Sequence, residues 1–237
     1  MINIIVLMAG SGHRFRQAGY KECKPMIDVC GKPMIEKVIE NLTPKYREHS
    51  FIFVTLSSMA DKRLLSILRK PNSTIIELPY ITEGATCSAL KAEGLINNNP
   101  LIIASCDQLV DIDIDEFIDF AWASDGCLLT FPSDRLHCSF TKTNKENRVV
   151  QVAEKKVISR HANIGIYWFK QGNYFIKAAK QMIQKNIRTN NEFYVAPVYN
   201  EMLDKKITIY EIKKEQTHLL GTPDELNDYI KRSSKNH

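Results

Sequence analysis

The sequence predicts an α/β fold in which a mostly parallel, mixed sheet is flanked by helices. Over roughly the first 131 residues, short apolar runs alternate with helical segments. The runs are continuously apolar, as in strands buried on both faces of a parallel sheet, and the alternation gives right-handed parallel units. After that point, short strand-like segments follow one another across polar turns, so the predicted sheet is mixed.

All 237 residues are predicted to form one domain with two halves, about 1–131 and about 132–237. The length would also allow two small domains, but no linker, repeat or low-complexity segment divides the chain. An apolar content of 44% suits a globular protein that buries a sizeable core.

The first half is predicted to begin with a buried strand over residues 2–8 and a long loop over 9–31. Long loops in compact domains are usually functional. Pro33 suits the first turn of the helix that follows. The apolar stripe of that helix consists of Met34, Val38, Ile39 and Leu42. The later strands are predicted at 51–56, 73–78, 101–105 and 127–131, and the later helices at 61–69, 83–95 and 114–123.

The second half is predicted to hold shorter strands and three helices. Pro197 predicts a kink or a later start for the second of these helices. Thr222, Pro223 and Glu225 are the N-cap, first-turn and capping-box residues of the last one. The predicted strands are 139–142, 148–154, 163–169 and 207–212, and the first two helices are 172–186 and 192–203.

Composition argues against several classes of protein. No segment approaches the apolar length of a membrane span, and the N-terminus lacks the basic region of a signal peptide, so a cytoplasmic protein is expected. Six scattered cysteines without a C-x-x-C pair argue against a zinc site and a disulfide framework. The net charge of +5 suits anionic phosphate substrates.

Nucleic acid is not an expected partner. The basic residues are dispersed, apart from a tail end that contains Lys231, Arg232 and Lys235. No basic stripe with interleaved aromatic residues occurs.

A glycine-bearing loop follows the first strand and ends in Arg14. Glycine backbone can approach a ligand closely, and successive N–H groups can bind phosphate oxygens. Phe15 stands where a dinucleotide fingerprint needs glycine, and no Gly-Lys-Ser/Thr ending of a P-loop is present. What remains is a different triphosphate loop or a plain tight turn.

Two charged residues could act with this loop. Lys24, fixed beside Pro25, is either a point charge for an α-phosphate or a solvated surface lysine. Asp107 follows the strand over 101–105, and ligands of open α/β sheets bind at that end of the strands. Its carboxylate could hold Mg²⁺ or close an Asx turn.

Together these motifs resemble the sugar-phosphate nucleotidylyltransferase family, whose fold is of the Rossmann-like, nucleotide-diphospho-sugar transferase type. The resemblance rests on G-x-G-x-R at 10–14, K-P at 24–25, G-K-P-M-I at 31–35 and S-C-D-Q at 105–108. The proline that often precedes the lysine is Cys23 here.

The resemblance implies roles for particular residues, with 1–131 as a nucleotide half and 132–237 as an acceptor half. Arg14 and Lys24 would be catalytic, and Asp107 would bind Mg²⁺. The nucleotide would be bound by Met8, Ala9, Gly10, Ser11, Gly12, Glu83, Gly84, Ala85, Thr86 and Cys106. The acceptor would be bound by Glu154, Lys155, Asn163, Gly165 and Glu192.

Two departures from the family pattern leave questions open. Leu219 stands where the family has an aspartate that is a second metal ligand. Either one carboxylate suffices, or Asp111 or His218 assists, or metal binding is weakened. A lysine, Lys156, replaces the usual proline after Lys155, so either lysine could face the acceptor.

The expected activity is transfer of an NMP from an NTP to a phosphorylated small molecule, with release of pyrophosphate. The M-A-G-x-G-x-R-F opening resembles short cytidylyltransferases of surface polysaccharide synthesis, so CMP is the expected group. The acceptor would be a sugar phosphate, or phosphorylated choline or glutamine. A homo-oligomer is possible.

Two other functions remain open. A nucleotide-sugar glycosyltransferase would use the D-x-D sequence at 111–113 to bind metal. A regulatory nucleotide-binding subunit without turnover would be consistent with Leu219.

Overall fold

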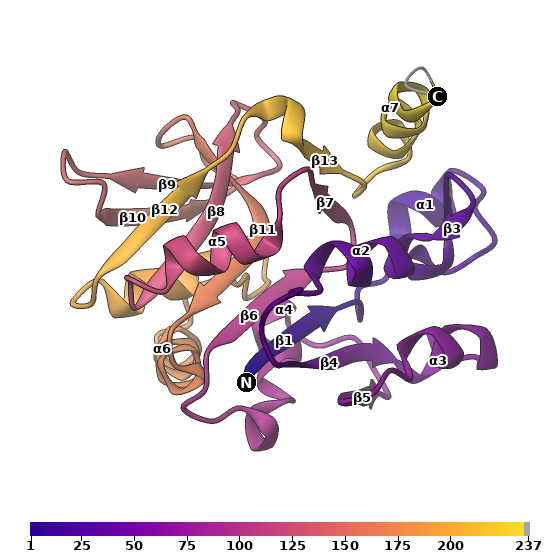
Figure 1. Cartoon of the computed structure of the whole chain (residues 1–237), viewed down its shortest axis with the longest axis horizontal. Helices are drawn as coiled ribbons and strands as arrows, with labels where there is room; N and C mark the ends of the chain where they lie inside the picture. Colours follow the sequence, from indigo (N-terminus) through magenta and orange to yellow (C-terminus); the bar gives the residue numbers. More distant parts are fainter. Residues whose placement is uncertain (235–237) are drawn as a thin grey trace.

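The computed structural model describes residues 1–234, and a nine-stranded mixed sheet runs through it with helices on both faces (Figure 1). This confirms the predicted fold class. Lys235 of the basic tail end lies outside the described residues.

The centre of the sheet is strand β1 (Ile2–Leu7), which pairs in parallel with β4 (His49–Leu56) and β6 (Leu101–Ser105). Strand β5 (Ser73–Leu78) adds to β4, also in parallel. Because β1 is covered on both faces, its side chains are almost fully buried. The register pairs Leu7 with Ser105, so the segments leaving β1 and β6 emerge side by side.

Strand β11 (His161–Phe169) joins the two halves, because it pairs antiparallel with β6 and with β8 (Gly126–Pro132). Strand β12 (Ile207–Glu211) lies parallel to β8. The hairpin of β9 (Ser139–Thr143) and β10 (Val149–Glu154) extends the sheet beyond β11. The sheet therefore continues from the predicted nucleotide half into the predicted acceptor half.

Helices cover the two faces over separate apolar clusters. On one face, α2 (Met34–Leu42), α3 (Lys62–Leu68) and α5 (Ile114–Ala121) pack over Ile4 and Val6. On the other, α4 (Ala85–Leu90) and α6 (Gly172–Gln184) pack over Ile5. The C-terminal helix α7 (Pro223–Ser233) begins at the Thr222 cap as predicted, because the Thr222 hydroxyl accepts a bond from the Glu225 N–H.

The helix predicted over 192–203 is wrong in its start and its type, whereas the later start that Pro197 predicts is confirmed. Residues 192–195 are not helical, and a 3₁₀ segment, η4 (Ala196–Met202), follows them. Pro197 supplies no N–H, and the Phe193 backbone bonds instead to the Glu83 carbonyl and the Thr86 N–H. Hydrogen bonds to a distant segment of the same chain thus replace helical hydrogen bonds at this point.

Other boundaries also differ from the prediction. The helix predicted over 83–95 ends at Leu90 and is followed by a 3₁₀ turn, η3 (Glu93–Leu95). The helix predicted from 31–33 begins at Met34, because β3 (Lys32–Pro33) pairs with β2 (Asp28–Val29). The long loop also contains α1 (His13–Gln17) and η1 (Lys24–Met26).

A small two-stranded sheet beside Asp107 was not predicted. Strand β7 (Gln108–Val110) pairs antiparallel with β13 (Thr217–Leu219) after a 3₁₀ turn, η5 (Lys214–Gln216). Strands of three residues carry too few side chains to show an alternating pattern. This sheet brings the segment that leads into α7 beside Asp107.

Within residues 1–234, no helix has both the length and the apolar character needed to cross a membrane. All six cysteines are free thiols.

Candidate active site

Two adjoining cavities lie where β1 and β6 end. The loop cavity, of about 550 Å³, is lined by residues 8–15, Lys24 and part of the 81–88 segment. The hairpin cavity, of about 360 Å³, is lined by residues of β10 and β11 and by the 192–195 segment. The residues that line both cavities are Leu7, Arg14, Ala85, Ser105, Asp107, Glu192 and Gly221. Both cavities therefore open onto Asp107.

The loop cavity is formed by the turn that leaves β1. Gly12 has a φ of 63°, a left-handed conformation that favours glycine, and it forms the N-cap of α1. The turn places the Arg14 side chain at the junction of the two cavities. All of the predicted phosphate-loop residues, Met8, Ala9, Gly10, Ser11 and Gly12, line the loop cavity.

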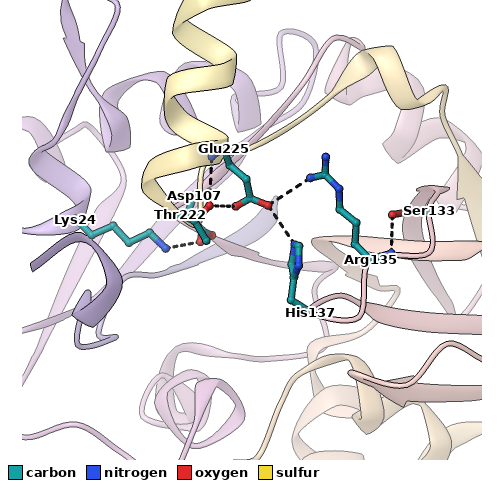
Figure 2. A network of polar contacts seen from close by, with 7 residues as sticks. All are labelled: Lys24, Asp107, Ser133, Arg135, His137, Thr222 and Glu225. Carbon is teal, nitrogen blue, oxygen red and sulfur yellow. Dashed lines mark hydrogen bonds and ion pairs between the residues drawn. The ribbon is translucent and has the colours of Figure 1, made fainter. Parts of the chain in front are cut away.

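Lys24 and Asp107 form an ion pair at this junction (Figure 2). Lys24 lies in η1 and Asp107 lies two residues after the end of β6, and their side chains are 19% and 24% exposed. Burial alone would lower the pKa of Lys24, but the Asp107 carboxylate outweighs burial and the pKa is raised. Lys24 is therefore a charged ammonium at the centre of the site.

The 82–86 segment is held against Phe193 in the second half of the chain. Gly84 has a φ of 131°, and a Cβ atom there would lie 2.5 Å from the backbone N and O of Phe193. The N–H of Phe193 donates to the Glu83 carbonyl at 2.8 Å, and that of Thr86 donates to the Phe193 carbonyl at 3.0 Å. A side chain on residue 84 would break this contact.

Not every predicted nucleotide residue of this segment faces a cavity. Gly84 and Ala85 line the loop cavity, and so does Cys106. The Glu83 side chain instead pairs with Arg188, and Thr86 is fully buried. Thr82 and Ser88, which the sequence analysis did not select, line the cavity and share a 2.7 Å hydrogen bond.

The five predicted acceptor residues all line the hairpin cavity. Lys155 follows β10 and its ammonium donates to the Tyr194 hydroxyl at 2.6 Å. Lys156 is exposed and lines neither cavity, so Lys155 is the lysine that faces the cavity. The Asn163 amide bonds to Ser139 and Thr141, which fixes the wall of the cavity.

Glu154 carries an unusual carboxyl group. Burial raises its pKa from 4.5 to about 7, Lys155 offsets part of this rise, and Glu192 adds to it. Tyr167 and Tyr194 line the same cavity, and burial raises the pKa of both hydroxyls.

Gly165 shapes the same wall. It has a φ of 102°, and a Cβ atom there would lie 3.4 Å from Ser105 Oγ and from Gln108 Oε1. Cavity residues that were not predicted for the site include Gln108, His137, Tyr167, Tyr194 and Glu225. Gln108 stands in the S-C-D-Q motif and Glu225 in the capping box, but only the topology brings the five residues together.

The Asp107 carboxylate fits a site for one Mg²⁺ that would be bound mainly through a nucleotide. No group of three His, Cys, Asp or Glu residues within 1–234 is placed to hold a metal ion. Mg²⁺ commonly takes one or two protein carboxylates together with substrate phosphates and water. Asp107, which faces both cavities, suits such a site.

The residues considered as a second metal ligand are engaged elsewhere. His218 Nε2 lies 2.7 Å from Asp111 Oδ2, and neither residue lines the two cavities. Leu219 is held by pairing with Gln108 across the small sheet. The Glu225 carboxylate lies across Gly221 from Asp107 and contacts Arg135 and His137 (Figure 2).

Comparison with known families gives one match over almost the whole chain. The model described as "Nucleotidyl transferase" matches residues 3–233.

Curated relatives are similar over part of their own length. The bifunctional protein GlmU of Methanocaldococcus jannaschii is 25% identical over 170 residues, which are 71% of this chain and 40% of that protein. A putative mannose-1-phosphate guanyltransferase of Sulfolobus acidocaldarius is 23% identical over 180 residues, which are 72% of this chain and 49% of that protein. The chain thus spans about half the length, or less, of these relatives.

Solved structures share the fold. A nucleoside-diphosphate-sugar pyrophosphorylase from Vibrio cholerae superposes with a TM-score of 0.76 at 24% identity, over 98% of this chain and 100% of that one. A putative glucose-1-phosphate thymidylyltransferase from Bacillus anthracis gives a TM-score of 0.80 at 16% identity, over 98% and 95%. A UDP-glucose pyrophosphorylase bound to UDP-glucose gives 0.80 at 18% identity, over 100% of both chains.

Proposed function

The chain belongs to the nucleotidyl transferase family, and from this membership we propose that it transfers an NMP from an NTP to a phosphorylated small molecule and releases pyrophosphate. The observation that carries the proposal is the junction of the two cavities. One cavity has the glycine loop of a triphosphate site, the other has a lysine and carboxylates, and both open onto Arg14 and Asp107.

The reaction needs no general base. The acceptor is a phosphate monoester, so its oxygen is already an anionic nucleophile near pH 7. That oxygen bonds to the α-phosphorus in line, and the bond from the α-phosphorus to the bridging oxygen breaks as pyrophosphate leaves. Catalysis then depends on positioning and on neutralising negative charge.

The chain's own groups would carry out these tasks. The backbone of residues 9–12 and Arg14 would bind the β- and γ-phosphates. Lys24, charged and part-buried, would stabilise the α-phosphoryl group as it is transferred. Lys155 would hold the acceptor phosphate in the hairpin cavity.

The rest of that cavity would hold the body of the acceptor, through Glu154, Asn163, Gly165 and Glu192. Mg²⁺, held by Asp107 and the triphosphate, would neutralise charge on the phosphate oxygens.

The proposal also specifies which nucleotide is used and which kind of acceptor receives it. We propose CMP as the transferred group, on the M-A-G-x-G-x-R-F sequence that starts at Met8. The relatives named above are described as acting with other nucleotides or as bifunctional proteins, so the base is a point for experiment. The acceptor would be a sugar phosphate or a phosphorylated choline or glutamine, for use in surface polysaccharide synthesis.

The geometry disfavours the glycosyltransferase alternative. Asp113 caps α5 and pairs with Lys45, and Asp111 pairs with His218. Neither aspartate of this D-x-D sequence lines the two cavities, so the motif is not placed to bind a nucleotide-sugar metal there.

A pyrophosphate-release assay tests the proposal. The protein is incubated with Mg²⁺, each of the four NTPs and a panel of phosphorylated acceptors. Pyrophosphate release that requires both substrates, and that stops when Mg²⁺ is chelated, supports it. Tight NTP binding without release by any pair would favour the regulatory alternative.

A further inference from the structure

The hairpin cavity contains more carboxylates than cations available to balance them. The four carboxylates that line it belong to Asp107, Glu154, Glu192 and Glu225. Two of them are paired within the protein, Asp107 with Lys24 and Glu225 with Arg135 and His137. Glu154 and Glu192 form no ion pair within residues 1–234, and of these two Glu154 is half-buried whereas Glu192 is exposed to solvent.

Glu154 is the carboxylate that most needs a partner. It is half-buried and faces the cavity, and no hydrogen bond or ion pair to its side chain occurs within residues 1–234. Partial removal of a carboxylate from water without a partner is costly, and burial raises the pKa of Glu154 to about 7. The protein therefore holds an acidic group ready for a partner that enters the cavity.

The lysine beside it is already committed. The Lys155 ammonium donates to the Tyr194 hydroxyl and lies 4.7 Å from the centre of that ring. Of the described residues that line the hairpin cavity, only Lys155 and Arg14 carry a permanent positive charge. In the proposed reaction both would contact phosphates, one of the acceptor and one of the NTP.

Charge balance then restricts the acceptor. A neutral sugar phosphate would draw Lys155 to its phosphate and leave Glu154 and Glu192 close together without a counter-charge. Hydroxyl groups can donate hydrogen bonds to these carboxylates, but they supply no charge. An ammonium group would supply it. Tyrosine rings attract cations, as the contact of Lys155 with the Tyr194 ring shows, and Tyr167 and Tyr194 both line this cavity.

We propose that the acceptor is a zwitterion: a phosphate monoester that also carries an ammonium group, which binds between Glu154, Glu192 and the tyrosine rings of the hairpin cavity. This inference rests on the proposed nucleotidyl transfer and specifies its acceptor. The ammonium group takes no part in bond making. It positions the acceptor while the phosphate oxygen attacks.

Isothermal titration with charge-matched pairs of ligands tests the inference. Phosphocholine is compared with 3,3-dimethylbutyl phosphate, which has the same shape without the charge. Glucosamine 1-phosphate is compared with glucose 1-phosphate. All titrations are done at neutral pH with Mg²⁺ and a non-hydrolysable CTP analogue bound, and NTP binding is measured separately.

The wild-type protein should bind at least one of the two ammonium compounds about tenfold or more tightly than its neutral partner, a difference of about 1.4 kcal/mol. Glu154→Gln should reduce that preference to threefold or less, because the variant loses affinity for the ammonium compound in particular. Glu146→Gln, an exposed glutamate in the turn of the same hairpin, should keep the wild-type preference.

Three results would overturn the inference. The first is equal or tighter binding of the neutral partner in both pairs. The second is an ammonium preference that survives in Glu154→Gln. The third is NTP binding with no binding of either ammonium compound. If pyrophosphate is still released with a neutral sugar phosphate, nucleotidyl transfer stands and only the zwitterion fails. If no NTP binds at all, both proposals fail.

Discussion

At the scale of single residues, the site depends on a few charges that the fold brings to two adjoining cavities. Short sequence motifs led to the prediction of Arg14, Lys24 and Asp107, and they left Lys155 and Lys156 as alternatives. The partners of these charges were not predictable in the same way. Tyr194, which accepts a bond from Lys155, is 39 residues away along the chain.

Lys24→Ala should lower kcat/KM for pyrophosphate release by about a hundredfold or more, the size expected when one preorganised charge contact to a transition state is lost. The measurement is steady-state kinetics at saturating Mg²⁺. Lys21→Ala, an exposed lysine of the same loop, is the matched control and should keep wild-type turnover. Near-normal turnover in Lys24→Ala would remove Lys24 from the mechanism.

Glu154→Gln should stabilise the ligand-free protein at pH 8. The folded-state pKa of Glu154 is raised to about 7 from 4.5, chiefly by burial, so the folded protein holds a proton that the unfolded chain has lost between these values. Stability therefore falls as pH rises from about 4.5 to about 7, and this penalty persists above pH 7. Glutamine removes the penalty.

Chemical denaturation measures the effect. We expect Glu154→Gln to exceed the wild type by about 2–3 kcal/mol in free energy of unfolding at pH 8, with the difference vanishing near pH 4. Glu146→Gln should match the wild type at both pH values. A wild type that is as stable as Glu154→Gln at pH 8 would show that the buried carboxylate has a partner.

At the scale of elements, the site is built where segments far apart in sequence are joined by backbone hydrogen bonds. The strands and most helices could be predicted, because their apolar patterns are local. The segment over 192–195 could not, since its backbone bonds are made to residues 83–86 rather than within a helix. The three-residue strands β7 and β13 were missed because they carry almost no pattern of their own.

Gly84→Ala tests whether the contact between the 83–86 and 192–195 segments supports the site. A Cβ atom at Gly84 would lie 2.5 Å from Phe193 backbone atoms at a φ of 131°, so the two segments would have to separate. We expect a loss of about 3 kcal/mol or more in unfolding free energy, measured by urea denaturation.

The control for this variant is Gly94→Ala. A Cβ atom at Gly94 meets nothing within 4 Å, and its backbone is not left-handed, so this variant should differ little from the wild type. Similar stability of the two variants would mean that the 83–86 segment can shift freely, and the contact would not be a structural constraint.

At the scale of the whole molecule, one sheet carries both cavities. Strand β6 joins the parallel and the antiparallel parts of this sheet, because it pairs in parallel with β1 and antiparallel with β11. The sequence predicted the α/β class and the division into two halves from the change of pattern near residue 131. It could not predict that β11 would turn the second half back against β6, which is what makes the cavities adjoin.

The central claim is that the chain moves the α-phosphoryl group of an NTP, with its nucleoside, onto a phosphorylated acceptor. The most direct measurement uses CTP labelled with ³²P at the α or at the γ position, with Mg²⁺ and the acceptor that gives release. We expect the α label in an acceptor-dependent product and the γ label in pyrophosphate. The γ label in the acceptor product, or the α label in free CMP or CDP at the same rate with and without acceptor, would contradict the claim.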